Sequence, residues 1–191
     1  VFPFLREYER WTTATMNAFT GPLFDQYLGR LEEGLRKTGL KGDLFIMSSS
    51  GGTVTPEVAR QFPVRMLESG PAAGVLQTAT LGRQLKRPDL LSFDMGGTTA
   101  KGALVRNDQP LKRYEMEVAR VHEFRAGSGL PAKIPVIDLI EIGSGGGSIA
   151  AVDARGTIAV GPHSAGAVPG PACYGQGGTD PTLTDANLTL G

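Results

Sequence analysis

The chain has 191 residues, of which 40% are apolar and 20% are charged, with 19 basic residues balanced by 19 acidic ones. This balance gives no bulk electrostatic support to binding of nucleic acid or an anionic membrane, and the apolar stretches fall short of the roughly 18 residues of a membrane span. No secretory signal pattern is visible, and Cys173, the single cysteine, cannot form an internal disulfide. We therefore expect a cytoplasmic protein with no nucleic-acid or membrane partner.

Glycine is the unusual feature of the composition. The chain contains 27 glycines, which is about twice the average usage of about 7%. The glycines are clustered, and this favours sites built from backbone over disorder. The glycine-rich segment 143–178 also contains apolar residues that flexible linkers lack. It is predicted to be a buried, tightly turning and mostly β part of the fold.

The first elements are predicted from the spacing of apolar residues. Helical spacing runs over residues 3–37, and Gly21-Pro22 should kink or break that helix. An apolar run over 44–47 predicts a buried strand. Thr55-Pro56 is typical of a helix start and predicts a short helix through residue 61. A second helix is predicted to follow and to end near Leu85.

Strands are predicted to dominate the rest of the chain, at residues 90–95, 100–105, 113–121, 136–142 and 148–152. Together with the helices they indicate an α/β fold. We expect a helical N-terminal segment over 1–42 that packs on a larger lobe over 43–191. Because the sequence starts with Val1 and stops in an apolar run, we also expect the whole chain to be a fragment of a longer protein.

The most informative motif is Phe93-Asp94-Met95-Gly96-Gly97-Thr98-Thr99. An apolar strand delivers Asp94 to its carboxyl end, and two glycines, Gly96 and Gly97, can take positive φ and let the chain approach an anion closely. Successive backbone N–H groups, with the hydroxyls of Thr98 and Thr99, then form a nest that suits phosphate. Asp94 would hold Mg²⁺ through water, beside the phosphate. The alternative is a structural hairpin turn that uses Asp and Gly for geometry alone.

Two further turns are candidate nucleotide contacts. The turn Ser48–Thr53 follows a predicted strand and offers Ser50 and Gly51 to a phosphate or a ribose. Gly70 and Gly74 lie at the start of a predicted helix, where free N–H groups and small side chains let a ligand come close. The alternatives are an ordinary strand-to-helix loop for the first turn and tight helix–sheet packing for the second.

A third group of polar residues lies near the C-terminus. Asp180, Asp185 and Asn187 offer oxygen ligands for a substrate or for Mg²⁺. The alternative is that these side chains cap turns beside Pro181, because Asp and Asn readily bond to neighbouring backbone groups. The sequence leaves both interpretations open.

The remaining reactive side chains give weaker signals. Cys173 has no basic residue nearby in the sequence that would lower its pKa, so a small buried thiol is favoured over a nucleophile. His122 and His163 are 41 positions apart and have no Cys or Glu at ligand spacing. This spacing argues against a zinc site.

The order of the motifs along the chain resembles the hydantoinase A/oxoprolinase family of the sugar kinase, Hsp70 and actin superfamily. This family includes ATP-dependent N-methylhydantoinase, 5-oxoprolinase and a subunit of acetone-type carboxylases. The resemblance covers residues from about Ser48 to the C-terminus. The motifs that carry it are Ser49-Ser50-Gly51-Gly52, Glu68-Ser69-Gly70-Pro71-Ala72-Ala73-Gly74, Phe93-Asp94-Met95-Gly96-Gly97-Thr98-Thr99, Ile142-Gly143-Ser144-Gly145-Gly146-Gly147-Ser148, Pro169-Gly170-Pro171-Ala172-Cys173-Tyr174-Gly175 and Gly178-Thr179-Asp180-Pro181-Thr182-Leu183-Thr184-Asp185-Ala186-Asn187.

The resemblance implies a ribonuclease H-like, actin-like ATPase fold, in which helices flank a mixed sheet. It implies ATP and Mg²⁺ as cofactors and a parent enzyme that opens a cyclic amide, hydantoin or 5-oxoproline, by phosphorylating the carbonyl oxygen. A hydantoinase B-type second subunit or domain is the implied partner. The motif at Asp94 matches the second of two phosphate turns in such proteins, and the first one is absent from this chain. We therefore expect this chain alone to be inactive.

Two other functions stay open from the sequence. The parent protein is alternatively a subunit of an ATP-dependent ketone carboxylase, which would share this part of the chain. It is alternatively a non-catalytic actin-like module that binds nucleotide and changes shape. Ile140-Glu141 departs from the His-Thr pair that the family pattern leads us to expect at this position, which leaves the substrate undecided.

Overall fold

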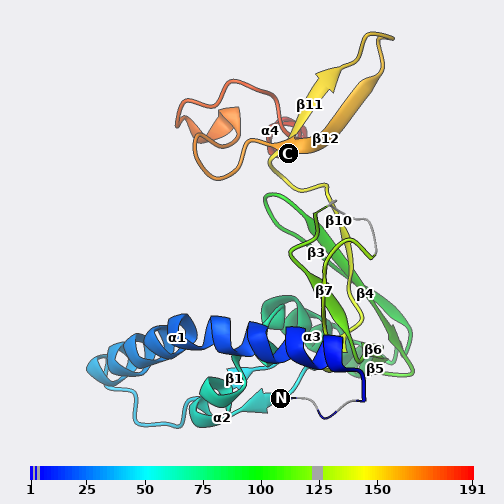
Figure 1. The fold of residues 1–191 in the computed structure, drawn as a ribbon. Coiled ribbons are helices and arrows are strands. Elements are labelled where there is room, and N and C mark those ends of the chain that lie inside the picture. Colours follow the sequence, from blue (N-terminus) through cyan, green and yellow to red (C-terminus); the bar gives the residue numbers. More distant parts are fainter. Residues whose placement is uncertain (2, 4, 122–126) are drawn as a thin grey trace. The chain divides into compact units, whose positions relative to one another are not determined.

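The computed structural model describes residues 1, 3, 5–121 and 127–191 (Figure 1). The chain divides into two compact units, the first made of Val1–Ser92 and Ala103–Asp138 and the second of Phe93–Gly102 and Leu139–Gly191. This division does not follow the boundary expected after residue 42, because the N-terminal helix packs against later elements of the first unit.

The first unit begins with a single long helix, α1 (Glu7–Lys37), which continues through Pro22. The prediction that Gly21-Pro22 breaks the helix is therefore wrong. A proline in a helix removes one backbone donor, and here the loss falls on a turn whose proline ring is exposed. The neighbouring turns dock firmly, since α1 contacts α2 (Pro56–Gln61), the 3₁₀ helix η1 (Pro63–Met66) and β8 (Leu130–Ala132).

Two short elements and a helix follow α1. Strands β1 (Ile46–Met47) and β2 (Thr53–Val54) pair as an antiparallel hairpin, shorter than the predicted strand at 44–47. Helix α2 starts after Thr55 with proline in its first turn, as the sequence predicted. Helix α3 (Ser69–Leu85) also lies where it was predicted, and it contacts β1, β5 and β9 of the same unit.

The middle of the chain forms several short strands in place of two long ones. The strand predicted over 113–121 is β6 (Lys112–Arg113) and β7 (Met116–Val118), and these two strands pair with different partners. Antiparallel pairs form between β6 and β9 (Val136–Ile137), between β7 and β8, and between β5 (Gln109–Pro110) and the end of β4 (Ala100–Arg106). Alternation along the sequence does not show where a strand changes partner, which explains the difference.

Two clusters of buried side chains in the first unit include residues of α1 or pack against it. One contains Leu28, Ala59 and Met66, with Phe24 and Leu31 packed against it. The other contains Val64, Ala132, Ile134 and Val136, with Met16, Leu67 and Met116 packed against it. The opposite face of α1 exposes large apolar side chains, among them Trp11 (73%), Phe19 (84%) and Leu23 (70%). Among the described residues, no helix is both long enough and apolar enough to cross a membrane.

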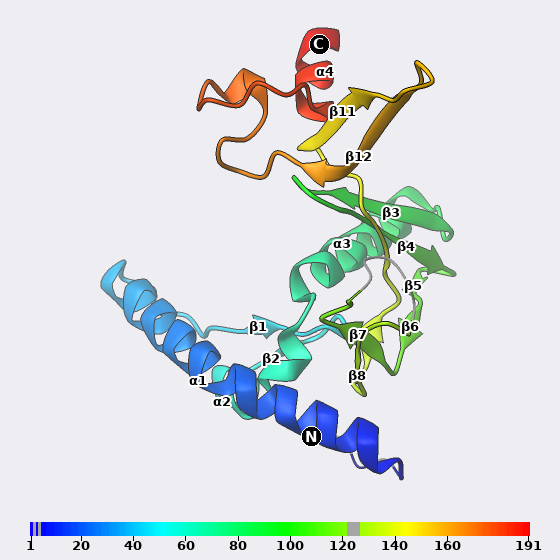
Figure 2. The ribbon, with the colours of Figure 1, turned by 45° about the horizontal axis from the view of Figure 1, so that its top comes forward.

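The second unit is built from strands, glycine turns and one short helix (Figure 2). β10 (Ile140–Ile142) pairs antiparallel with β4, and β11 (Ser148–Val152) pairs antiparallel with β12 (Ile158–Ser164). The 3₁₀ helix η2 (Ala172–Tyr174) and α4 (Leu183–Leu190) complete it. β11 lies where it was predicted.

The prediction that segment 143–178 is buried is wrong for most of its side chains. Ile158 is 71% exposed, Val168 81% and Tyr174 53%. The buried residues of the segment are Gly145, Gly147, Ser148, Gly170 and Pro171. A two-stranded hairpin buries its faces only against another layer, and among the described residues of this unit only α4 contacts the β11–β12 hairpin in this way.

The described residues combine helices with strands, and the strands form several small sheets. β10, β4 and β3 (Leu90–Met95) lie in that order in one sheet, with β5 paired to the far end of β4. Only four residues connect β3 to β4, which is too few for a parallel connection, so these strands form a hairpin. Every strand pair among the described residues is therefore antiparallel. The mixed sheet of an actin-like ATPase stays a prediction.

Candidate functional site

The turn between β3 and β4 occupies the position predicted for phosphate binding. The N–H of Gly96 donates to the carbonyl of Thr99 at 2.9 Å and closes the turn. Neither Gly96 nor Gly97 has a positive φ, so backbone freedom does not explain these glycines. A Cβ atom placed on Gly97 would meet no heavy atom within 4 Å. No contact among the described residues requires glycine at 97, and the open space above its backbone suits a ligand.

A second glycine segment, Gly145–Gly147, lies directly behind this turn. The N–H of Gly146 donates to the carbonyl of Gly96 at 2.9 Å, and the N–H of Gly147 donates to the carbonyl of Gly97 at 2.6 Å. A Cβ atom on Gly145 would lie 2.6 Å from the carbonyl carbon and oxygen of Gly97, closer than real Cβ contacts come. These glycines are required by backbone-to-backbone packing. The sequence analysis gave them no role, although a run of three glycines was the available signal.

In the turn at Gly96–Thr99, the carbonyl acceptors are bound within the protein, whereas several donors are not. The carbonyls of Gly96 and Gly97 are occupied by the segment behind them. Among the described residues, the amides of Gly97 and Thr98 and the hydroxyls of Thr98 and Thr99 donate to no protein acceptor. Free donors on a turn whose acceptors are already bound form a surface that favours an anion.

Asp94 is exposed near the carboxyl end of β3, immediately before this turn. Counting back from the bond between Gly96 and Thr99 places Asp94 opposite Lys101 on β4, and Lys101 lies opposite Glu141 on β10. The ammonium of Lys101 is 3.7 Å from the Glu141 carboxylate, which gives Glu141 a partner within the sheet. No group of three acidic, histidine or cysteine side chains among the described residues is placed to hold a metal. Asp94 therefore fits Mg²⁺ only as a single ligand, with phosphate oxygens and water as the others.

Ser50 and Gly51 belong to the loop of the β1–β2 hairpin in the first unit, not to a strand-to-helix loop. The Ser50 hydroxyl lies 3.0 Å from the Ser48 hydroxyl, and the buried Ser49 hydroxyl donates to the carbonyls of Arg65 and Leu67. Gly51 has φ +81° and lies against Ile137 and Leu76. Hairpin geometry accounts for each of these residues, and their contact with nucleotide stays a prediction.

Gly70 and Gly74 lie one turn apart on the exposed side of α3. A Cβ atom on either glycine would meet nothing within 4 Å, so tight helix–sheet packing does not explain them. The packed side of the same helix carries Ala72, Val75 and Ala79, which are buried. Glycine costs about 1 kcal/mol in a helix relative to alanine. A role of Gly70 and Gly74 in nucleotide binding stays a prediction.

Asp185 is held by four hydrogen bonds that end on its carboxylate. It accepts from the N–H and the hydroxyl of Thr182 at 2.8 and 2.7 Å, which together with the Asp185 N–H form the capping box of α4. It also accepts from the N–H groups of Cys173 and Ala172, at 2.7 and 3.3 Å. The bonds from Thr182 and Cys173 hold the pKa of Asp185 far below its usual range. This is the capping role that the sequence offered as the alternative to a substrate or Mg²⁺ ligand.

The other residues of the C-terminal group are open to solvent. Asp180 and Asn187 are exposed, so a role in substrate binding stays a prediction for both. Cys173 is exposed as well, contrary to the buried thiol that the sequence favoured. Hydrogen bonding to the nearby Asp185 carboxylate raises the pKa of the Cys173 thiol. His163 is exposed on β12, and His122 lies outside the described residues.

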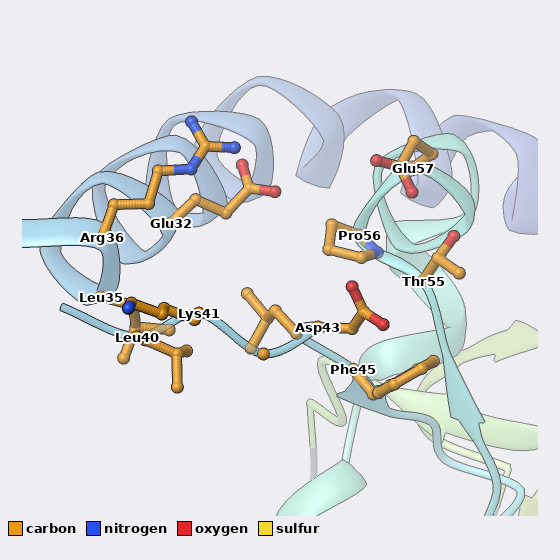
Figure 3. A pocket seen from close by; sticks show the side chains of 12 residues that line it. Glu32, Leu35, Arg36, Leu40, Lys41, Asp43, Phe45, Thr55, Pro56 and Glu57 are labelled. Carbon is orange, nitrogen blue, oxygen red and sulfur yellow. The ribbon is translucent and has the colours of Figure 1, made fainter.

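The first unit contains a pocket of about 470 Å³ between the end of α1, the following loop and the start of α2 (Figure 3). Its lining is part apolar and part charged. The charged side chains are the carboxylates of Glu32, Asp43 and Glu57 and the cationic groups of Arg36 and Lys41. The Glu57 backbone N–H and the Thr55 hydroxyl lower the pKa of Glu57, which keeps that carboxylate charged. The carboxylates of the lining outnumber its cationic side chains, so the pocket offers no net positive charge to a phosphate. No residue that the sequence analysis singled out as a ligand contact lines this pocket.

Comparison with known proteins gives a consistent result. The sequence model described as Hydantoinase/oxoprolinase matches residues 10–191. An uncharacterized protein of Methanocaldococcus jannaschii is 46% identical over 99% of this chain and 28% of its own length. Caprolactamase subunit alpha of Pseudomonas jessenii is 36% identical over 100% of this chain and 26% of its own. Acetophenone carboxylase gamma subunit of Aromatoleum aromaticum is 36% identical over 97% of this chain and 24% of its own.

Two solved structures share the fold. A nucleotide-free acetone carboxylase matches with a TM-score of 0.76 and 24% identity, over 99% of this chain and 25% of the other. The ATP-dependent caprolactamase from Pseudomonas jessenii matches with a TM-score of 0.72 and 33% identity, over 100% of this chain and 26% of the other. The chain thus spans about a quarter of the length of the relatives it matches.

Proposed function

Because the chain belongs to the hydantoinase/oxoprolinase family, we propose that it is part of an ATP-dependent enzyme that hydrolyses a cyclic amide. The observation that supports this most directly is the turn at Gly96–Thr99, whose free donors face outward while its carbonyls are bound from behind. A turn of this kind suits a phosphate group and offers little to a neutral ligand.

The reaction follows from the chemistry of amides. An amide carbonyl resists attack by water, and transfer of the terminal phosphoryl group of ATP to the carbonyl oxygen turns that oxygen into a leaving group. Water then adds to the carbon, the ring C–N bond breaks, and phosphate leaves. The balance is cyclic amide, ATP and water giving an open-chain amino acid, ADP and phosphate. Such a transfer depends on positioned phosphates and on charge stabilisation more than on a strong protein nucleophile.

The residues of the second unit take distinct parts in this proposal. The amides of Gly97 and Thr98, with the hydroxyls of Thr98 and Thr99, bind phosphate oxygens. Asp94 orients Mg²⁺ through water, and the metal supplies neutralisation of phosphate charge when it is bound. Hydantoin, 5-oxoproline and caprolactam are the cyclic amides to test, because the family description and a relative's name point to them. A hydantoinase B-type second subunit is the proposed partner, since two relatives are named as subunits.

A carboxylase is the second candidate function. The acetophenone carboxylase gamma subunit is as similar in sequence as the caprolactamase subunit, and the acetone carboxylase structure has the higher TM-score. In this case ATP would activate a ketone oxygen or bicarbonate, through the same phosphate turn. The two functions differ in substrate and not in the use of Asp94.

The experiment that tests the proposal uses the full-length parent enzyme with its second subunit. ADP release is measured with hydantoin, 5-oxoproline and caprolactam, and separately with ketones plus bicarbonate. ADP release that requires a cyclic amide supports the hydrolase, whereas release that requires a ketone and bicarbonate supports the carboxylase. We expect Asp94→Asn to lower turnover by about 100-fold or more. Full turnover in Asp94→Ala would instead indicate a nucleotide-binding module without catalysis at this turn.

A further inference from the structure

The first turn of α4, Thr182–Asp185, contacts the back of the glycine segment that supports the phosphate turn. We call this first turn the α4 brace. The backbone N–H and the side-chain hydroxyl of Thr184 both donate to the carbonyl of Gly146, each at 2.8 Å. The N–H of the same Gly146 donates to the carbonyl of Gly96. One peptide of the glycine segment therefore links α4 to the turn.

Thr184 and Gly146 are in close contact. A Cβ atom on Gly146 would lie 2.7 Å from the Thr184 hydroxyl oxygen. Gly147 is fixed in the same way, because its N–H donates to the carbonyl of Gly97 and its own carbonyl accepts the N–H of Ala165 at 2.8 Å. The carbonyls of the phosphate turn thus bond to a segment that is itself held by α4 on one side and by the loop after β12 on the other.

The α4 brace also forms hydrogen bonds with elements other than the glycine segment. Asp185 closes the capping box with Thr182 and accepts the N–H groups of Ala172 and Cys173, so α4 is tied to η2. The N–H of Ala150 on β11 donates to the carbonyl of Pro181 at 2.8 Å, and Ile149 forms a bridge with Thr182. A helix of eight residues with no buried side chain is marginal by itself. These polar links, and not a hydrophobic core, hold it in place.

From these contacts we propose that Thr184 is a positioning residue for phosphate binding, acting through Gly146 on the turn at Gly96–Thr99. The inference rests on the proposed function, since it assigns to Thr184 a part in ATP use without contact to ATP. Because the carbonyls of Gly96 and Gly97 are bound from behind, the turn presents the free amides of Gly97 and Thr98 in one fixed arrangement. Without the Thr184 hydroxyl, Gly146 keeps one of its two donors and the turn becomes looser. Preorganised donors bind a developing charge more strongly than mobile ones.

The test compares three single variants in the full-length enzyme with its second subunit. Thr184→Val removes the hydroxyl and keeps the branched shape, while Thr184→Ser keeps the hydroxyl and serves as the rescue. Thr189→Val is the matched control, because the Thr189 hydroxyl lies on the same helix and donates only to the carbonyl of Asp185. We expect Thr184→Val to raise KM for ATP by about 2- to 10-fold, the value of one net hydrogen bond. KM for the organic substrate should stay unchanged, and Thr184→Ser and Thr189→Val should both behave like the natural enzyme.

Hydrogen–deuterium exchange provides a readout that does not depend on activity. The amides of Gly146 and Gly147 should exchange faster in Thr184→Val than in Thr189→Val, because their acceptors lie on the loosened turn. Equal exchange and equal KM for ATP in these two variants would overturn the role of Thr184. So would a rise in KM for both substrates together with a lower melting temperature.

If the natural enzyme shows no ATP-dependent turnover and binds no nonhydrolysable ATP analogue, the proposed function fails and takes this inference with it. If the natural enzyme binds the analogue and Thr184→Val binds it with unchanged affinity, this inference alone is overturned.

Discussion

The amide nitrogen of Gly147 lies 2.6 Å from the carbonyl oxygen of Gly97, so two glycine turns that are 50 positions apart in the sequence share a backbone hydrogen bond. Only glycine allows the two chains to come this close, since a Cβ on Gly147 would lie 2.9 Å from the same oxygen. On the other side of the turn, Gly97 faces open space. The glycines of the two turns therefore have different roles, and we expect their substitution to have different effects on stability.

We expect Gly145→Ala to destabilise the second unit and Gly97→Ala to leave it folded. The added methyl group on Gly145 would overlap the backbone of Gly97, and overpacking of this kind costs about 1–3 kcal/mol. The methyl group on Gly97 meets nothing and should change stability by less than about 0.5 kcal/mol. Urea unfolding of each variant measures the difference. Equal destabilisation by both substitutions would contradict this division of roles.

A second prediction concerns the two faces of α1. Leu28 is fully buried beside Ala59 and Met66, whereas Leu23 is 70% exposed on the opposite face. We expect Leu28→Ala to cost about 2–5 kcal/mol of unfolding free energy. Leu23→Ala is the matched control and should change it by less than about 0.5 kcal/mol. A large loss in the control would mean that the outer face of α1 is covered in the protein that is measured.

The local motifs predicted more of this structure than the long-range pattern did. The starts of α2 and α3 and the hairpin at Gly96–Thr99 follow from neighbouring residues, and these predictions are confirmed. The burial of segment 143–178 was wrong, because burial depends on a second layer that the sequence of the segment does not encode. The role of Thr184 was missed for a similar reason. Its partner, Gly146, is 38 positions away and offers only a backbone carbonyl.

The candidate site shows the same limit. The residue types at Asp94–Thr99 predicted a turn with free donors, and the structure has one. For Asp185, in contrast, the residue type alone fits a metal ligand as well as a helix cap. Its four hydrogen bonds come from both α4 and η2, and no spacing rule indicates that these elements meet. The three-dimensional contacts show that Asp185 is a cap, and its part in binding a substrate or Mg²⁺ stays a prediction.

Because the pKa of Asp185 is lowered, we expect its carboxylate to contribute to the stability of the fold even in moderate acid. Because its pKa is lower in the folded than in the unfolded protein, the ionised carboxylate stabilises the fold above the unfolded value of about 3.9. That contribution decreases progressively as the pH falls below the unfolded value, and it is fully lost only below the much lower folded value. We expect the melting temperature of Asp185→Asn to lie below that of the natural chain at pH 7, with the gap narrowing in strong acid. A gap that is constant with pH would show that the charge of Asp185 plays no part.

A fourth prediction concerns nucleotide binding by residues 1–191 alone. The turn at Gly96–Thr99 is the one that we propose for phosphate binding, and the two relatives compared above are about four times as long as this chain. Donors on one turn provide a few hydrogen bonds to a phosphate that stays exposed to water, so we expect binding of ATP weaker than about 1 mM. Isothermal titration with ATP and Mg²⁺ measures it. Binding in the micromolar range would contradict the view that this chain holds only part of the nucleotide site.

The final prediction uses Cys173 as a reporter of the contact between α4 and η2. The Asp185 carboxylate accepts the Cys173 N–H at 2.7 Å and raises the pKa of the Cys173 thiol, so the exposed thiol is less ionised than a free one. Alkylation by iodoacetamide requires the thiolate. We therefore expect slow alkylation at pH 8 in the natural chain and faster alkylation in Asp185→Asn, which removes the negative charge. Since Cys173 is the single cysteine, the rate refers to this residue alone.

Thr189→Val, a change on the same helix that leaves Asp185 in place, should alkylate as slowly as the natural chain. An equal rate in all three proteins would mean that Asp185 does not hold η2 against α4 in solution.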